Sequence, residues 1–138
     1  MYVRHCAWLM TVPDKEKQTR LDRLQATGSP LAELPELDGL QYLAEYLMEV
    51  GPVESTGMGP APLSYREIAS WSEATDTHLS PWDAQMLRHL SRVYVRAAHD
   101  AKEPSAPAPY RDAMNIEQQR QSVVAGFKAL ARRGKRNG

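Results

Sequence analysis

Two segments rich in proline divide the chain into pieces that can hold only short helices. Residues 51–63 contain three glycines and three prolines, and residues 103–109 contain three prolines. Proline lacks the amide hydrogen that a helix interior needs, and its ring clashes with the preceding turn. We therefore expect a loop of defined shape at 51–63 and an extended, stiff linker at 103–109. Helices must lie before, between and after these two breaks.

Apolar residues recur at helical spacing on both sides of the first break. Over residues 36–50 they follow one another at steps of three and four, which predicts an amphipathic helix that ends at Gly51-Pro52. Ser64 and Glu67 have the spacing of a capping box, which predicts a helix from there to residues 75–77. Ser80 before Pro81 and Asp83 predicts the start of another helix, of about five turns.

The remaining pieces give weaker signals. Residues 14–26 are charged and favour a helix, but their apolar surface is small, so a partly disordered arm is the alternative. Residues 112–133 predict a last helix, which is followed by a frayed basic tail. Residues 6–12 are apolar but too short for a usual signal sequence, and we interpret them as a strand or buried arm. No stretch approaches the length of a membrane span.

These elements predict an all-α fold, a small bundle of four to five helices with a Gly/Pro-rich loop, an extended N-terminal arm and a basic C-terminal tail. We expect an arm or short helix at 1–33, a helical core domain at 34–101, a Pro-rich linker at 102–111, and a helix with a basic tail at 112–138. The predicted core collects the residues on the apolar faces of the helices: Leu43, Leu47, Ile68, Trp71, Trp82, Met86, Leu90 and Tyr94.

The chain is polarised in charge although its net charge is zero. Residues 31–83 hold ten acidic residues and one basic residue, whereas residues 111–138 hold seven basic and two acidic residues. Glu45 and Glu49 lie one turn apart on the helix over 36–50. Such a charged side is usually a solvated face, and it also fits a surface for a basic partner. The overall balance gives no field that would attract nucleic acid or an anionic membrane.

The sequence carries no pattern typical of an enzyme or a metal site. The four histidines are not spaced as metal-ligand pairs and are expected at the surface. The single cysteine, Cys6, excludes an internal disulfide. A nucleophile elbow, a P-loop and a dinucleotide fingerprint are all missing from the sequence. We predict a protein without catalytic activity, cofactor or metal.

The two capped helices also reproduce the layout of a helix-turn-helix. In such a unit the first turns of the second helix meet base edges beside phosphates. Here those turns carry Trp82, Asp83 and Gln85 within the acidic part of the chain. Repulsion from the phosphates argues against that docking. A DNA-binding regulator therefore stays as the alternative, with the basic tail as a weak contact.

The residues that form the loop and the two helix starts resemble the tail assembly chaperones of long-tailed bacteriophages and related prophages. The similar positions fall in order with matching gaps: Gly59, Pro60, Pro62, Tyr65, Glu67, Ile68, Trp71, Pro81 and Trp82. The resemblance covers about residues 34–98 and leaves the first 33 residues unmatched. It departs from the family before the loop, where only Tyr42 and Tyr46 supply the usual aromatic residues.

The resemblance implies a carrier that brings tail tube subunits to the tape measure protein. It implies action in the cytoplasm of the host bacterium and absence from the mature virion. A loop with little freedom loses little entropy on docking, so we expect the partner to contact Met58, Pro60, Pro62 and Tyr65, with Glu45 and Glu49 as a second surface. A virion structural protein, such as a connector or minor tail protein, is the remaining alternative. The oligomeric state stays open.

Overall fold

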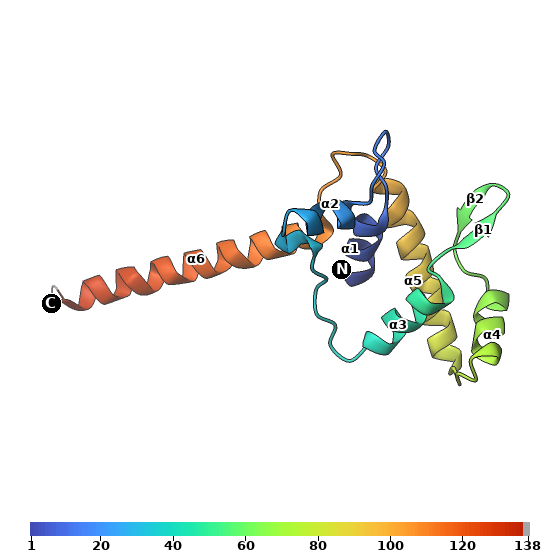
Figure 1. Ribbon diagram of the computed structural model, residues 1–138. Helices are drawn as coiled ribbons and strands as arrows, with labels where there is room; N and C mark the ends of the chain where they lie inside the picture. Colours follow the sequence, from blue (N-terminus) through green and yellow to red (C-terminus); the bar gives the residue numbers. More distant parts are fainter. Residues whose placement is uncertain (137–138) are drawn as a thin grey trace.

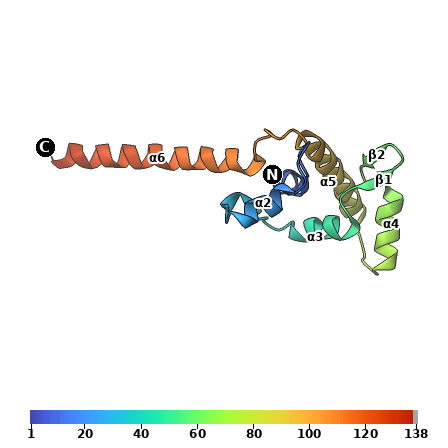
Figure 2. The same ribbon diagram turned by 45° about the horizontal axis from the view of Figure 1, so that its top comes forward.

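The computed structural model describes the backbone of residues 1–136. After residue 110, side chains are described only at residues 120–129, 131 and 132. A two-stranded hairpin and several helices follow one another along the chain. In order, the elements are α1 (Tyr2–Met10), α2 (Arg20–Ala26), the short 3₁₀ helix η1 (Pro30–Ala32), α3 (Gln41–Val50), β1 (Glu54–Thr56), β2 (Gly59–Ala61), α4 (Tyr65–Ala74), α5 (Pro81–Asp100) and α6 (Pro109–Arg136). Figures 1 and 2 show a body built around α5, from which α6 extends as a single rod.

The core lies where α1, α3 and α4 meet α5. Its buried members come from each of these helices and from the segment before α4: Val3, Cys6, Ala7, Leu43, Leu47, Leu63, Ile68, Leu87 and Tyr94. Burial of Leu43, Leu47, Ile68 and Tyr94 is thereby confirmed, and Met86 and Leu90 pack against the cluster while partly exposed. Trp71 is half-buried, and the centre of its ring lies 5.1 Å from the centre of the Tyr46 ring.

The prediction of a core position is wrong for Trp82, whose side chain is 49% exposed. Trp82 lies in the first turn of α5, and the buried cluster contains no residue of α5 before Leu87. The helical period correctly places Trp82 on the stripe of Met86 and Leu90, but at its position in the first turn of α5 half of the side chain stays exposed.

The N-terminal segment is a helix and not the predicted strand or extended arm. Six of the nine residues of α1 are buried. Val3, Cys6 and Ala7 face the cluster around α5, whereas Trp8 and Leu9 join a second cluster with Ala101 and Ala108. Residues 6–10 are an uninterrupted apolar run, and periodicity alone cannot tell such a short run from a buried strand, which is why the sequence pattern did not reveal the helix.

The second cluster joins α1 and α2 to residues 101–108, which follow α5. Trp8 donates a hydrogen bond from Nε1 to the carbonyl of Ala106, at 2.9 Å. Arg20, which is 1% exposed, donates to the carbonyls of Ala101 and Glu103 at 2.6 and 2.8 Å. Residues 101–108 therefore pack against α1 and α2, although their prolines predicted a linker. The predicted helix over 14–26 is shorter and begins at Arg20, where the hydroxyl of Thr19 caps it.

The mostly helical class is confirmed, and the loop at 51–63 adds a small antiparallel sheet that the sequence did not predict. Glu54 pairs with Ala61, Ser55 with Pro60 and Thr56 with Gly59. Strands of three residues are too short to show an alternating pattern. Gly59 adopts φ +106°, a conformation that favours glycine. The fold is therefore not purely all-α.

The helix starts agree with most of the predicted signals. Ser80 and Asp83 form a complete capping box at the start of α5, with Pro81 as the first helical residue. At α4 the hydroxyl of Ser64 accepts from the amide of Glu67, as predicted. The second half of that box differs, because the amide of Ser64 donates to the carboxylate of Glu54 in β1 at 3.1 Å. A residue of the hairpin thus caps α4. 

Candidate functional site

The hairpin carries exposed side chains at its tip and along its second strand. We define the hairpin surface as Met58, Pro60, Pro62 and Tyr65. Met58 is fully exposed in the turn between β1 and β2, and Tyr65 is 51% exposed in the first turn of α4. Pro60 is exposed and Pro62 is half-buried. Figure 1 shows the hairpin and α4 at the end of the body that is distant from α6.

A buried serine fixes both ends of the hairpin to α5. Ser91 donates from its hydroxyl to the carbonyl of Pro52 at 2.8 Å, and the same oxygen accepts from the amide of Leu63 at 2.8 Å. These contacts hold the segment before β1 and the segment after β2 on the same point of a helix. The hydroxyl of Thr56 donates to the carbonyl of Gly59 at 2.6 Å and closes the turn itself. The exposed tip therefore stands on a fixed base.

The ring of Tyr65 makes a cation–π contact with an arginine side chain. The guanidinium of Arg88 on α5 lies 4.9 Å from the centre of the Tyr65 ring. Such a contact stabilises by about 0.5–1 kcal/mol at an exposed site. Since half of the Tyr65 side chain stays exposed, the ring has a fixed orientation and a free surface, which suits an anchor for a partner.

The acidic α3 face is a second surface, which we define as Glu45 and Glu49 with the flanking side chains of Tyr42 and Met48. All four are exposed, the last two at 39% each. The hydroxyl of Tyr42 donates to Asp83 at 2.8 Å and so links α3 to the start of α5. Two hydrogen bonds from Ser80 lower the pKa of Asp83 most, and the hydrogen bond from Tyr42 lowers it further.

The structure places the predicted contact residues in two groups. Met58, Pro60, Pro62 and Tyr65 belong to one continuous segment, whereas Glu45 and Glu49 lie on α3, from which the hairpin tip points away in both views (Figures 1 and 2). Among the described residues, no hydrogen bond or ion pair joins the two groups. A partner could therefore use one of them without the other.

A third feature, the arginine groove, was not predicted. This groove of about 800 Å³ lies between α1, α5 and the segment before α6. Arg4 lines it from α1, and Arg92 and Arg96 line it from α5. The sequence does show Arg92 and Arg96 one turn apart on a polar side of their helix. Only the packing of α1 on α5 adds Arg4 and makes the surface concave.

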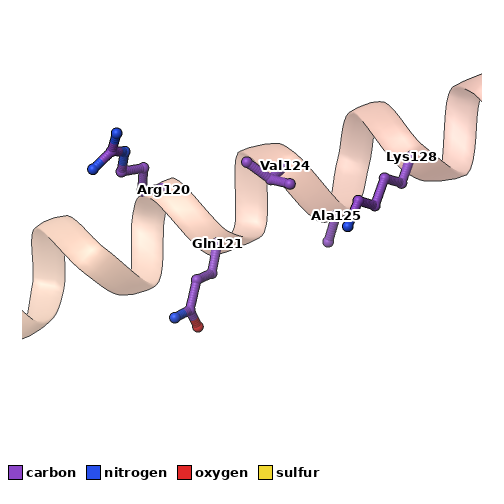
Figure 3. Close-up of a pocket in the computed structure, with 5 residues that line it drawn as sticks. All are labelled: Arg120, Gln121, Val124, Ala125 and Lys128. Carbon is purple, nitrogen blue, oxygen red and sulfur yellow. The ribbon is translucent and has the colours of Figure 1, made fainter.

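Helix α6 carries apolar side chains that no other element covers. Val123, Val124 and Phe127 are 58%, 49% and 70% exposed. Figure 3 shows a shallow hollow along this helix, lined by Arg120, Gln121, Val124, Ala125 and Lys128, which all come from α6 itself. It is a surface of one helix and not a cleft between elements.

The prediction of surface positions holds for three of the histidines and is wrong for His5. His78, His89 and His99 are exposed, whereas His5 is completely buried. His5 binds the carbonyl of Leu31 through Nε2 at 2.9 Å and stacks on Trp8. Within the described residues, no group of three or more histidine, cysteine, aspartate or glutamate side chains is arranged to hold a metal ion. No helix in that part of the chain is long and apolar enough to cross a lipid bilayer.

The start of α5 is already occupied by contacts within the chain. Helix α4 contacts α5, and Figure 1 shows it alongside the first half of α5, running in the opposite direction. Asp83 in the first turn of α5 accepts hydrogen bonds from Ser80 and Tyr42. A carboxylate therefore occupies the turn that a helix-turn-helix would present to DNA.

Comparisons of the chain with protein families, with curated proteins and with solved structures find no match.

Proposed function

We propose that this protein is a non-enzymatic tail assembly chaperone of a long-tailed bacteriophage, which binds tail tube subunits through the hairpin surface and helps to deliver them to the tape measure protein. The observation that carries the proposal is the fully exposed Met58 on a hairpin whose two ends are fixed by Ser91. A fixed support with exposed apolar anchors loses little entropy on binding. In this role the protein acts in the cytoplasm of the host and leaves the finished tail.

The residues that resemble the family coincide with this surface. The resemblance runs through residues 57–82, which form the hairpin turn, α4 and the start of α5. Residues 51–65 contain no lysine or arginine, so the surface favours a protein partner over nucleic acid.

Co-expression with the tail tube protein encoded beside it tests the proposal. We expect the tube protein to co-purify with the chain and to stay soluble in its presence. Met58→Ser with Tyr65→Ala is expected to weaken this binding at least tenfold, since two exposed anchors are removed. Met10→Ser is the matched control, because Met10 is also exposed but lies at the end of α1.

Four results would contradict the proposal or part of it. A tube protein that neither co-purifies nor gains solubility contradicts the chaperone role. Full binding by the double variant contradicts the hairpin surface alone. Detection of the chain in purified virions supports a structural tail protein instead, and salt-dependent binding to duplex DNA that survives removal of residues 132–138 supports the DNA-binding alternative.

A further inference from the structure

The arginine groove combines positive charge with an apolar floor. Its floor is built from Trp8, Val93, Ala97, Ala101 and Ala106, and two prolines form the edge near α6. Arg4, Arg92 and Arg96 are exposed above this floor, and no carboxylate among the described residues lies within ion-pair distance of them. Arg92 and Arg96 repel one another across one helical turn. Asp100, one turn after Arg96, is the one carboxylate of the lining and forms no ion pair with these arginines, so three positive charges face one negative charge.

These properties define the chemistry of what the groove can bind. Guanidinium groups pair best with carboxylates or phosphates. A nucleic acid backbone would satisfy the arginines but would set sugars and phosphates against the apolar floor. An amphipathic protein segment with carboxylates beside apolar side chains satisfies both parts, as in the docking of a helix in a groove.

The acidic α3 face has this composition. Glu45 and Glu49 lie one turn apart, as Arg92 and Arg96 do, so each pair spans about 6 Å along its helix axis. Tyr42 and Met48 beside them are 39% exposed and offer apolar surface. Gln41 donates a hydrogen bond to Glu45, and no lysine or arginine of the described residues pairs with either carboxylate.

We propose that the arginine groove of one copy of the chain binds the acidic α3 face of a second copy. The contact cannot form within one molecule, because α3 buries Leu43 and Leu47 against the core and turns Glu45 and Glu49 away from α5. Two different surfaces meet, so each bound pair leaves one free groove and one free α3 face. Association is therefore head-to-tail and extends into a chain or closes into a ring.

The size of the surfaces sets the strength of this association. Helix α3 is only about 15 Å long, so the contact belongs with small, transient interfaces. Much of its attraction is electrostatic and is screened by salt within about 10 Å at 0.1 M ionic strength. We expect self-association at high protein concentration that weakens as salt is added.

Sedimentation velocity on the full chain, over a range of concentrations at low and high salt, tests the proposal. Arg92→Glu with Arg96→Glu, and separately Glu45→Arg with Glu49→Arg, are each expected to weaken self-association at least tenfold. The chain with all four changes should regain it, and an equimolar mixture of the two double variants should form mixed species. Circular dichroism checks that each variant is folded.

Matched controls separate this contact from other occupants. Arg120→Glu with Lys128→Glu changes the charge of α6 by the same amount and should leave self-association unchanged. A wild-type chain that stays monomeric at all concentrations would overturn the proposal, as would a four-residue charge swap that fails to restore association. Loss of duplex DNA binding, without any loss of self-association, in the Arg92→Glu/Arg96→Glu variant would assign the groove to nucleic acid instead.

Discussion

At the scale of single residues, the buried His5 makes hydrogen bonds through both ring nitrogens. Its Nε2 lies 2.9 Å from the carbonyl of Leu31, which can only accept, so this nitrogen carries the hydrogen. Its Nδ1 accepts from the amide of Tyr110 at 3.4 Å and cannot hold a second proton without breaking that bond. A single side chain thus connects α1 to η1 and to the start of α6.

We predict that the stability of the protein falls as the pH drops below about 6.5, with His5 as one cause. Burial lowers the pKa of His5 below its ordinary value of 6.5, an effect that outweighs the backbone hydrogen bonds that raise it. The unfolded chain therefore binds more protons than the folded chain, so this stability is complete above pH 6.5 and is lost as the pH falls through that range. Urea unfolding across pH 5–8 measures the effect.

Two variants isolate the contribution of His5. His5→Gln should have a flatter dependence of unfolding free energy on pH than the wild type, whereas His99→Gln, at an exposed position, should retain the wild-type dependence. Titration of the His5 ring by NMR is the direct measurement. A pKa at or above 6.5 would show that the neutral form is not favoured.

Arg20 is a buried cation whose partners are carbonyl groups. Besides its bonds to Ala101 and Glu103, its guanidinium lies 5.0 Å from the centre of the Trp8 ring. We predict that Arg20→Ala lowers the free energy of unfolding by about 3 kcal/mol, because it leaves buried carbonyls unpaired and opens a cavity. Arg23→Ala removes the exposed ion pair with Glu16 and should cost less than about 1 kcal/mol. Equal losses in denaturant unfolding would contradict this account.

At the scale of elements, local signals predicted the helix starts. Contacts that depend on packing between distant segments were not revealed by the sequence. Ser80, Pro81 and Asp83 act within a single turn, so their meaning can be recognised without the rest of the chain. Ser91 gives no such signal, because its role depends on Pro52 and Leu63, which are distant in sequence.

The candidate site was likewise predicted only where it depends on local features of the sequence. Exposure of Met58 and Tyr65 followed from a loop and a first helical turn, both of which are local features. The arginine groove needs α1 beside α5, and the short apolar run of α1 did not distinguish a helix from a strand. The core position predicted for Trp82 was wrong for a related reason, since a periodic stripe does not tell how far along the helix it is buried.

Ser91 should control how firmly the hairpin is held. We predict that Ser91→Ala lowers the free energy of unfolding by about 1–3 kcal/mol, because the carbonyl of Pro52 and the amide of Leu63 lose their partner. Faster hydrogen exchange at residues 52–63 should accompany it. Ser70→Ala, at an exposed position of α4, is the control and should stay within about 0.5 kcal/mol of the wild type.

The two glycines around the hairpin turn offer a matched comparison. Gly59 has φ +106°, whereas Gly57 has no positive φ and has open space around it. We predict that Gly59→Ala destabilises the hairpin by about 1–3 kcal/mol and weakens binding to the tail tube protein, while Gly57→Ala leaves both nearly unchanged. If both variants bind equally well, the shape of the turn does not matter for binding.

At the scale of the whole molecule, a packed body and a projecting helix have different sources of stability. Around α5, buried side chains from four helices stabilise one another. Along α6, the described side chains from 120 to 129 are exposed, and contacts with the body lie near its start, at Tyr110. A helix without tertiary packing gains little from its apolar side chains in water.

Removal of residues 120–138 should therefore leave the body intact. We predict a change of less than about 0.5 kcal/mol in its unfolding free energy, because none of the described residues among those deleted belongs to either core cluster. Urea unfolding followed by tryptophan fluorescence measures it, since Trp8 and Trp71 lie in the body. The truncation also separates the two proposals at this scale. The hairpin surface and the arginine groove both lie before residue 120, so tube binding and self-association should survive it, and loss of either would assign that activity to α6.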